Sequence, residues 1–436
     1  MSNPPRVTSR PQAGADGSAQ DPSARAALAR ISSSRISLGR VFRAEGTNFY
    51  LLLGTTVFLV GFGLVMVLSS SSVESYLENQ GFFGSFLKQS AFALFGIPMM
   101  LLVSRLPISF WKWIAPFAMI GSSFLQALVV FTPLGVEVGG NKNWIDLGFV
   151  QFQPSELIKV SLVIWLGLIV SRKEDLLDDW KQGLAPILIT SGAAIGLVLL
   201  GDDLGTTFVL AAMLMGGLFF AGVRLRMLGM LVLAGAVLFG IMAVTSPSRV
   251  TRLMTFAGGC EDVAKQMNEC WQSTHGDFAL ANGGILGAGL GNSKAKWSWL
   301  PAAHNDYIFA IIGEELGLLG AIVVLLLFVV LAIAFVRIMN SSEDTFIRVA
   351  TATTMSWMIG QAFMNMGIVL GVFPVFGVPL PLISAGGTAL LTTLIGIGIV
   401  LSFARHTPEE REALGIPARR GLLGARRPSS RPHESS

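Results

Sequence analysis

The sequence has few charged residues, few cysteines and few histidines. Asp, Glu, Lys and Arg make up 13% of its 436 residues, about half the fraction that is usual in soluble domains. The two cysteines and four histidines form neither a zinc-ligand pattern nor a His-Glu-x-x-His motif. A Gly-x-Ser-x-Gly turn is also absent. The composition therefore argues against a soluble domain, a zinc site and a hydrolase with a nucleophilic triad.

Long uncharged apolar runs recur instead. Hydrophobic residues make up 52% of the chain, and its mean hydropathy is +0.64. We expect an all-α integral membrane protein, because only helices and closed barrels satisfy the backbone in lipid. About ten runs approach the roughly 20 residues that a transmembrane helix needs. Their expected cores are 49–70, 87–104, 109–132, 156–171, 184–201, 205–222, 227–245, 305–336, 347–371 and 385–404.

The Lys and Arg residues near the span ends predict the orientation. Most of them fall on one side, which we expect to be cytoplasmic together with both termini: Arg105, Lys112, Arg172, Lys173, Arg224, Arg226, Arg337, Arg348 and Arg405. The long loop 246–304, between the seventh and eighth spans, is then extracytoplasmic. Its cations are candidates for binding an anion outside the cell: Arg249, Arg252, Lys265, Lys294 and Lys296.

Two polar tails flank the expected membrane domain at 47–405. Residues 1–46 are rich in Ser, Ala, Pro and Arg and are predicted to be disordered, and 406–436 form a cytoplasmic C-terminal tail. Arg-rich tails account for most of the net charge of +4. Anionic inner-leaflet lipid explains that charge more simply than nucleic acid does. The first span is expected to be a retained signal-anchor rather than a cleaved signal peptide.

The stretch Leu300–Gly320 places polar groups at the start of an apolar helix. His304 and Asp306 come first, and Glu314 and Glu315 follow two to three turns later. Charges at that depth cost at least a few kcal/mol and mark function or a buried partner. For Asp306, a site at the membrane surface and a simple helix cap are both open. Small residues at spacings of four and three give a face that another helix can approach closely: Gly313, Gly317 and Gly320.

A second constellation follows residue 138 in VGGNKNWIDLGFVQFQPSELIKV. Glu156 and Lys159 are three residues apart and share a helix face. Capping explains Glu156, but it does not explain a lysine inside the membrane. We therefore favour a buried Glu–Lys pair facing a polar cavity. Trp144 fits an interfacial belt.

Two further segments each allow two interpretations. Asp202 and Asp203 form either a solvated turn with a helix cap or a site for a divalent cation, Mg²⁺ or Mn²⁺. The Gly-rich run 281–294 is either a tightly turned loop or a cradle in which backbone N–H groups, Lys294 and Lys296 hold a phosphate.

Two other segments lead to single expectations. The Pro- and Gly-bearing segment 365–391 predicts a broken helix that walls the same site. Cys260 and Cys270 share the outer loop, where we expect a disulfide rather than two free thiols.

Five separated motifs occur in the order in which the SEDS family (shape, elongation, division and sporulation) has them: QPSELIK, DLGTT, GILGAGLGNSK, LPAAHNDYIFAIIGEELG and GVPLPLISAGG. The resemblance covers about 47–405 and is stronger to division members than to elongation members. It implies a peptidoglycan glycosyltransferase that polymerises lipid II at the outer face of the bacterial cytoplasmic membrane, at the division septum. The implied partners are a class B penicillin-binding transpeptidase and other divisome proteins.

The resemblance also assigns roles to residues. It implies that Asp306 is the catalytic base, that Glu156 and Lys159 line the central cavity, and that Trp144 occupies an important loop position. The chain departs from the family where Asn143 follows Lys142 in place of an Arg before the Trp. It departs again at Gly201 and Asp202, where the family often has Gln-Pro.

The chemistry of the implied reaction needs a base and cations. A positioned carboxylate must take the proton of the attacking hydroxyl, and positive charge must stabilise the leaving diphosphate. We expect a single inverting displacement at the outer membrane surface. The candidate substrate contacts are Lys159, Lys294, Lys296, Arg249, Arg252 and His304. A lipid II flippase and a non-catalytic division scaffold remain the alternative functions.

Overall fold

The computed structural model describes residues 46–79, 81–138, 141–146, 148, 151–245, 256, 270–297 and 299–405. For residues 138, 238, 239 and 241–245 it describes the backbone alone. The predictions for the two tails, apart from residue 46, lie outside the described residues. So do those for Arg249, Arg252, Lys265 and Cys260.

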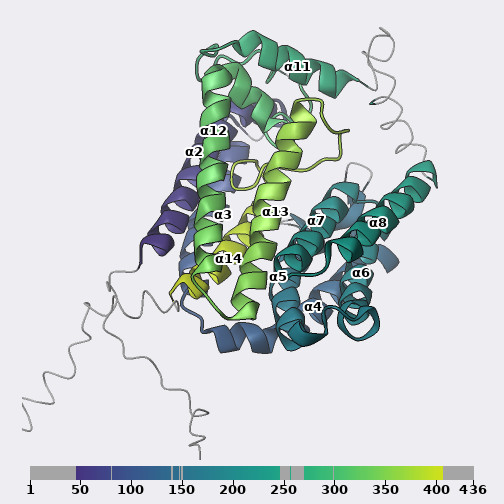
Figure 1. Cartoon of the computed structure of the whole chain (residues 1–436). Coiled ribbons are helices and arrows are strands. Elements are labelled where there is room, and N and C mark those ends of the chain that lie inside the picture. Colours follow the sequence, from purple (N-terminus) through teal and green to yellow (C-terminus); the bar gives the residue numbers. More distant parts are fainter. Residues whose placement is uncertain are drawn as a thin grey trace, which may run out of the picture. The chain divides into compact units, whose positions relative to one another are not determined.

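A helix overlaps each of the expected cores (Figure 1). The helices are α2 (Thr47–Leu77), α3 (Gly84–Val103), α4 (Ile108–Phe131), α5 (Pro154–Arg172), α6 (Ala185–Leu200), α7 (Leu204–Phe220), α8 (Leu225–Thr245), α12 (Ile308–Asn340), α13 (Thr345–Val369) and α14 (Gly387–Ala404). Short helical turns at Glu174–Leu176 and Trp180–Leu184 precede α6.

Hydropathy identifies the chain as a multi-pass membrane protein. Within the described residues, seven helices are long and apolar enough to cross a membrane, while α7 and the apolar part of α8 are shorter. The total of about ten spans therefore stays a prediction. The central helices are α5 and α14, in which 72% and 78% of the most apolar window is buried, against 28% in α3, α4 and α12. The outer helices present their large apolar side chains to lipid.

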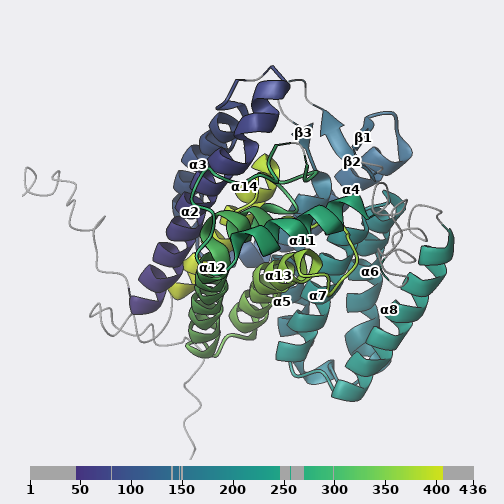
Figure 2. The same ribbon diagram turned by 90° about the horizontal axis from the view of Figure 1, so that it is seen from above.

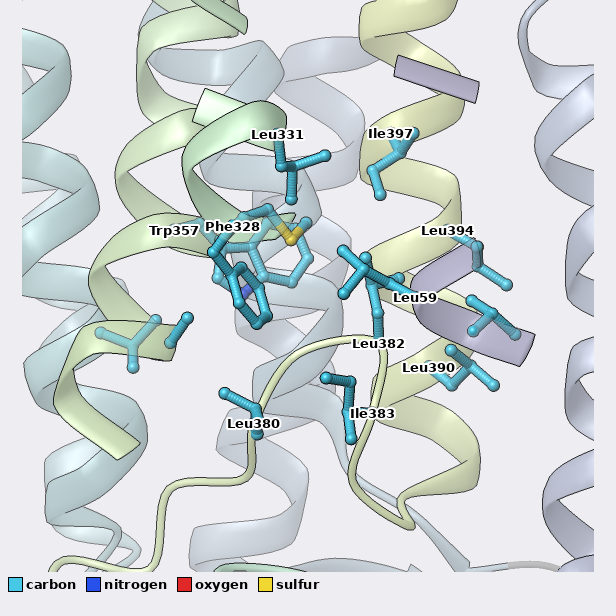
Figure 3. Close-up of a cluster of buried hydrophobic side chains, with 14 of the residues drawn as sticks. Leu59, Phe328, Leu331, Trp357, Leu380, Leu382, Ile383, Leu390, Leu394 and Ile397 are labelled. Atoms are coloured by element: carbon cyan, nitrogen blue, oxygen red, sulfur yellow. The ribbon is translucent and has the colours of Figure 1, made fainter. Parts of the chain in front are cut away.

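The connection between α13 and α14 enters the hydrophobic core. It is non-helical from Gly371 to Gly386, and Leu380, Leu382 and Ile383 join the buried cluster around Phe328 and Trp357 (Figure 3). A Cβ on Gly63 of α2 would lie 2.7 Å from the carbonyl oxygen of Leu382, so glycine permits this close approach. The predicted broken-helix segment is confirmed, and its part from Leu380 to Ser384 is buried in protein rather than in lipid.

The expected loops contain secondary structure that the sequence patterns did not predict. β1 (Gly135–Val138), β2 (Asn141–Asp146) and β3 (Gln151–Phe152) form an antiparallel sheet in that order, with Val136 opposite Trp144 and Ile145 opposite Phe152. Helix α11 (Trp271–Gly283) lies against the start of α12 (Figures 1 and 2). The expected helical membrane fold is confirmed, and one small sheet of short strands, which carry little periodic signal, is added to it in a loop.

Candidate functional site

A cavity of about 1110 Å³ opens where the ends of several helices meet. The start of α3, β2, the starts of α5 and α7, the segment before α12 and the α13–α14 connection all contribute to its wall. Six of the predicted site residues line it: Trp144, Glu156, Lys159, Asp203, His304 and Asp306. The structure thus brings together residues that are separated by up to 162 positions in the sequence.

The predicted Glu156–Lys159 pair is confirmed. Oε1 of Glu156 lies 2.6 Å from Nζ of Lys159, and the two side chains are only 4% and 3% exposed. Thr392 of α14 donates a hydrogen bond of 2.9 Å to the other oxygen of Glu156. The Lys159 ammonium lies 5.1 Å from the centre of the Trp357 ring, a cation–π contact. The pair is therefore a satisfied polar patch in the cavity wall rather than a helix cap.

Asp306 does not occupy the cap position of α12. Tyr307 is the N-cap residue, and it makes no side-chain capping bond. The half-buried Asp306 lines the cavity across from Gly377, whose Cβ, if it had one, would lie 3.5 Å from an Asp306 carboxylate oxygen. Asn365 of α13 donates hydrogen bonds of 2.7 Å to the carbonyls of Asp306 and Val378. One amide thus fixes the backbone of Asp306 to the opposite wall.

Asp202 and Asp203 are neighbours in sequence but have separate surroundings. Asp203 caps α7 by accepting a hydrogen bond of 2.9 Å from the Thr206 N–H, and it also accepts one from Gln153. Burial raises the pKa of the Asp203 carboxyl, which disfavours the anion that a divalent cation requires. Asp202 has a positive φ of 65° and does not line the cavity. The described residues contain no cluster of three or more His, Cys, Asp or Glu side chains with metal-site geometry. These residues do not fit a resident metal, and the divalent cation stays a prediction.

The Gly-rich run forms a cradle, but the anions in it are carboxylates of this chain. Backbone N–H groups of Lys294 and Ala295 donate to the side chain of Glu314, and that of Ser293 donates to Glu315. The N–H groups of Ala288 and Gly289 donate to the backbone carbonyls of the same two glutamates. Five backbone donors of this run therefore already bond to this chain's own glutamates, which favours the tightly turned loop over the phosphate cradle.

The two lysines of this run lie away from the large cavity. Lys296 is 6% exposed and lies 3.3 Å from Oε1 of Glu315, which also accepts hydrogen bonds from Ser69 of α2. Lys294 borders a separate cavity of about 480 Å³ beside α11. Of the two interpretations left open for Glu314 and Glu315, function or a buried partner, the structure shows buried partners. The placement of both lysines does not support a contact with substrate in the large cavity.

The expected close approach of another helix to the small-residue face of α12 is confirmed at Gly313, where α11 packs. Gly313 packs against Leu280 of α11. Gly317 has a φ of 67° and interrupts the helix, and the N–H groups of Leu318 and Leu319 donate to the carbonyls of Gly284 and Ile285. The close approach is therefore made by α11 and the turn after it, because the break frees backbone groups that the turn can pair.

Sequence reasoning missed several polar groups of the cavity. Ser85, Lys88 and Gln89 at the start of α3 line it, as does Gln272 of α11. The residues of α3 can be identified only from the contact between α3 and the α13–α14 connection. In that contact the Gln89 side chain donates to the carbonyl of Ser384 and accepts from the N–H of Gly386. Lys142 is no substitute for the family's arginine: its ammonium donates to the carbonyls of Val130 and Thr132.

Only one of the two cysteines of the expected disulfide lies among the described residues. Cys270 is fully buried at the start of α11 and is not a free thiol. Cys260 lies outside the described residues, so the pairing stays a prediction.

Residues 50–409 match the model of a cell cycle protein family, FTSW_RODA_SPOVE. The chain belongs to this family. A relative from Mycobacterium tuberculosis, named "Probable peptidoglycan glycosyltransferase FtsW", is 38% identical over 84% of this chain and 70% of its own length. A relative of the same name from Geobacter metallireducens is 34% identical over 79% of this chain and 92% of its own length.

Solved structures show that the family fold is shared. A chain from a peptidoglycan synthase complex has a TM-score of 0.67 at 23% identity and covers 84% of this chain and 98% of its own length. RodA of Thermus thermophilus has a TM-score of 0.62 at 22% identity, with coverage of 84% and 99%. The helical membrane domain therefore has the same fold as these solved structures.

Proposed function

We propose that this protein is a peptidoglycan glycosyltransferase that polymerises lipid II during septal cell-wall synthesis. Relatives that are 33–38% identical over most of the chain carry that enzymatic name. The observation that carries the proposal is the cavity itself. It places the Asp306 carboxylate, which does not cap α12, in the same space as the buried Glu156–Lys159 pair, at the ends of membrane helices.

The proposed reaction is one displacement. Asp306 takes the proton of the 4-hydroxyl of the acceptor sugar while that oxygen attacks the anomeric carbon of the donor. A new C–O bond forms, the bond from the anomeric carbon to the diphosphate oxygen breaks, and the configuration inverts. The diphosphate leaves with its electron pair and gains negative charge, which nearby positive groups stabilise. Lys88, Lys159 and His304 line the cavity and can supply that charge.

The partners of the reaction follow from the same proposal. We expect a class B penicillin-binding transpeptidase to work with the protein, with other divisome proteins, at the septum of the cytoplasmic membrane. The apolar faces of the outer helices contact membrane lipid and the undecaprenyl chains of the substrate.

The deciding experiment is Asp306→Asn in purified protein given lipid II, with and without a partner transpeptidase. The amide keeps the size of the side chain but cannot accept the proton, so polymerisation should fall by roughly 10²–10⁴-fold. Asp277→Asn is the matched control, because Asp277 is an exposed carboxylate of α11 outside the cavity. It should polymerise at the wild-type rate.

The alternatives give different results in the same assay. A flippase would translocate lipid II in liposomes without forming polymer, and a scaffold would do neither. Near wild-type polymerisation by Asp306→Asn would show that another group, with Glu156 the next candidate, is the base.

A further inference from the structure

Glu74, in the last turn of α2, contacts the histidine that precedes Asp306 by two residues. Nδ1 of His304 lies 2.8 Å from Oε2 of Glu74, and the two side chains are 23% and 43% exposed. The imidazole and the carboxylate are thus in close contact, although the angles at Nδ1 are not those of a well-aligned hydrogen bond. Of the two, only His304 lines the cavity. Glu74 itself does not line the cavity, so it can act on the cavity only through the ring of His304.

The backbone around His304 is held by other groups. Its carbonyl accepts a hydrogen bond of 2.9 Å from the N–H of Ala385. The next carbonyl, of Asn305, accepts one of 2.7 Å from the hydroxyl of Ser384, and that of Asp306 accepts one from Asn365. Because three successive carbonyls are already anchored, Glu74 has no share in positioning the main chain. Its contact acts on the imidazole alone.

The two nitrogens of the ring then have different surroundings. With Nδ1 turned to Glu74, the Nε2 edge is left for the cavity that also holds Asp306 and Lys88. An anion at Nε2 selects the imidazolium, since both ring nitrogens then donate, one to the carboxylate and one to the anion. A negative group of the substrate is the complementary partner for that arrangement.

We propose that Glu74 is a positioning residue, which orients His304 so that its Nε2 donates to the diphosphate of the lipid-linked substrate. This inference rests on the proposed function for its ligand. It places the anion-binding role in the cavity wall beside Asp306, where Lys294 and Lys296 do not reach. Negative charge on the diphosphate grows as the leaving group departs, so a donor at Nε2 acts on kcat as well as on binding.

The test is a double-mutant cycle with Glu74→Gln, His304→Gln and the double variant. The probe is undecaprenyl diphosphate, with uncharged undecaprenol as the comparison ligand. Each single variant should weaken diphosphate binding roughly 10-fold, the scale of one charge-assisted hydrogen bond. The double variant should be no weaker than either single one. Undecaprenol binding should be unchanged throughout.

Polymerisation of lipid II by the same variants separates positioning from structure. We expect kcat to fall in both single variants. Glu74→Asp keeps the negative charge and should restore part of the lost kcat. Glu78→Gln, a loss of charge four residues further along the chain, is the control and should behave as wild type. Additive effects in the cycle, or undiminished diphosphate binding by Glu74→Gln, would overturn the inference. If wild-type protein makes no polymer, the proposed function fails, while the cycle still reports on the pair.

Discussion

At the scale of single residues, the role of a charge depends on where it lies. Glu156 and Lys159 satisfy one another inside the bundle, and Glu314, Glu315 and Lys296 do the same beside the Gly-rich run. Asp306 is half-buried and lines a cavity wide enough for a substrate. The buried ion pairs stabilise the frame of the site, and the Asp306 carboxylate lies where a substrate can reach it.

The Glu156–Lys159 pair gives a prediction about stability. Glu156→Gln leaves the Lys159 charge buried without its counterion, which should destabilise the fold by about 3–5 kcal/mol. The double variant Glu156→Gln/Lys159→Met removes both charges and should recover much of that loss. Melting temperatures in detergent measure both effects.

The control for this prediction is Lys112→Met. Lys112 also contacts a carboxylate at 2.7 Å, that of Asp344, but the two side chains are 37% and 38% exposed. Such pairs contribute about 0–1 kcal/mol. A double variant no more stable than Glu156→Gln would contradict the view that the unpaired charge causes the loss.

At the scale of elements, the break in α12 decides how the outer segments assemble. The conformation of Gly317, φ 67° and ψ −168°, is one that only glycine adopts readily. The turn after α11 uses the break, since it pairs its own backbone with residues on both sides of it. α12 is thus two helical pieces with a polar junction, and the first piece follows directly from Asp306.

Replacing Gly317 by Ala tests the importance of this break. A Cβ there would clash with the backbone of Gly287 and Ile285, and the strained conformation alone costs roughly 1–3 kcal/mol. We expect a lower melting temperature and reduced polymerisation. Gly360→Ala is the matched control, because Gly360 lies within α13 with open space around it. Alanine there should stabilise the helix by about 0.5–1 kcal/mol, so equal melting temperatures for the two variants would count against the strain.

At the scale of the whole membrane domain, the cavity lies at one end of the helices. α3 begins at Gly84, near the cavity that Lys88 lines, and ends close to Arg105 after 20 residues, a length of about 30 Å. The contact between Lys112 and Asp344 and that between Glu174 and Thr345 lie near the far ends of their helices. Positive charge gathers at that end, which should be cytoplasmic.

Cysteine labelling tests this orientation. In a variant without the native cysteines, a membrane-impermeant maleimide should label Asp277→Cys, on exposed α11, in intact cells. Arg105→Cys, exposed at the other end, should react only after the membrane is opened. The reverse pattern would place the cavity on the cytoplasmic side and exclude polymerisation of an outward-facing substrate.

The positions of the helices could be predicted because run length and hydropathy act locally. Each expected core overlaps a helix, and the Glu156–Lys159 pair followed from a spacing of three on one helix face. The sheet and α11 could not be predicted, since short strands and a helix of weak amphipathic character carry little periodic signal. The cavity roles of Lys88 and Gln89 were also out of reach, because they depend on contacts with residues almost 300 positions away.

By itself, the sequence determined that this chain is a helical membrane protein of one family, with polar groups placed where apolar helices begin. Length and hydropathy decide membrane insertion, and that decision needs no tertiary contact. Only the tertiary structure decided which charges meet. Lys294 and Lys296 lie closer to Asp306 in sequence than Lys159 does, yet Lys159 shares its cavity. The physical reason is the break at Gly317, which lets the Gly-rich run pack against Glu314 and Glu315. Backbone N–H groups of the run and the Lys296 ammonium then bond to these two glutamates.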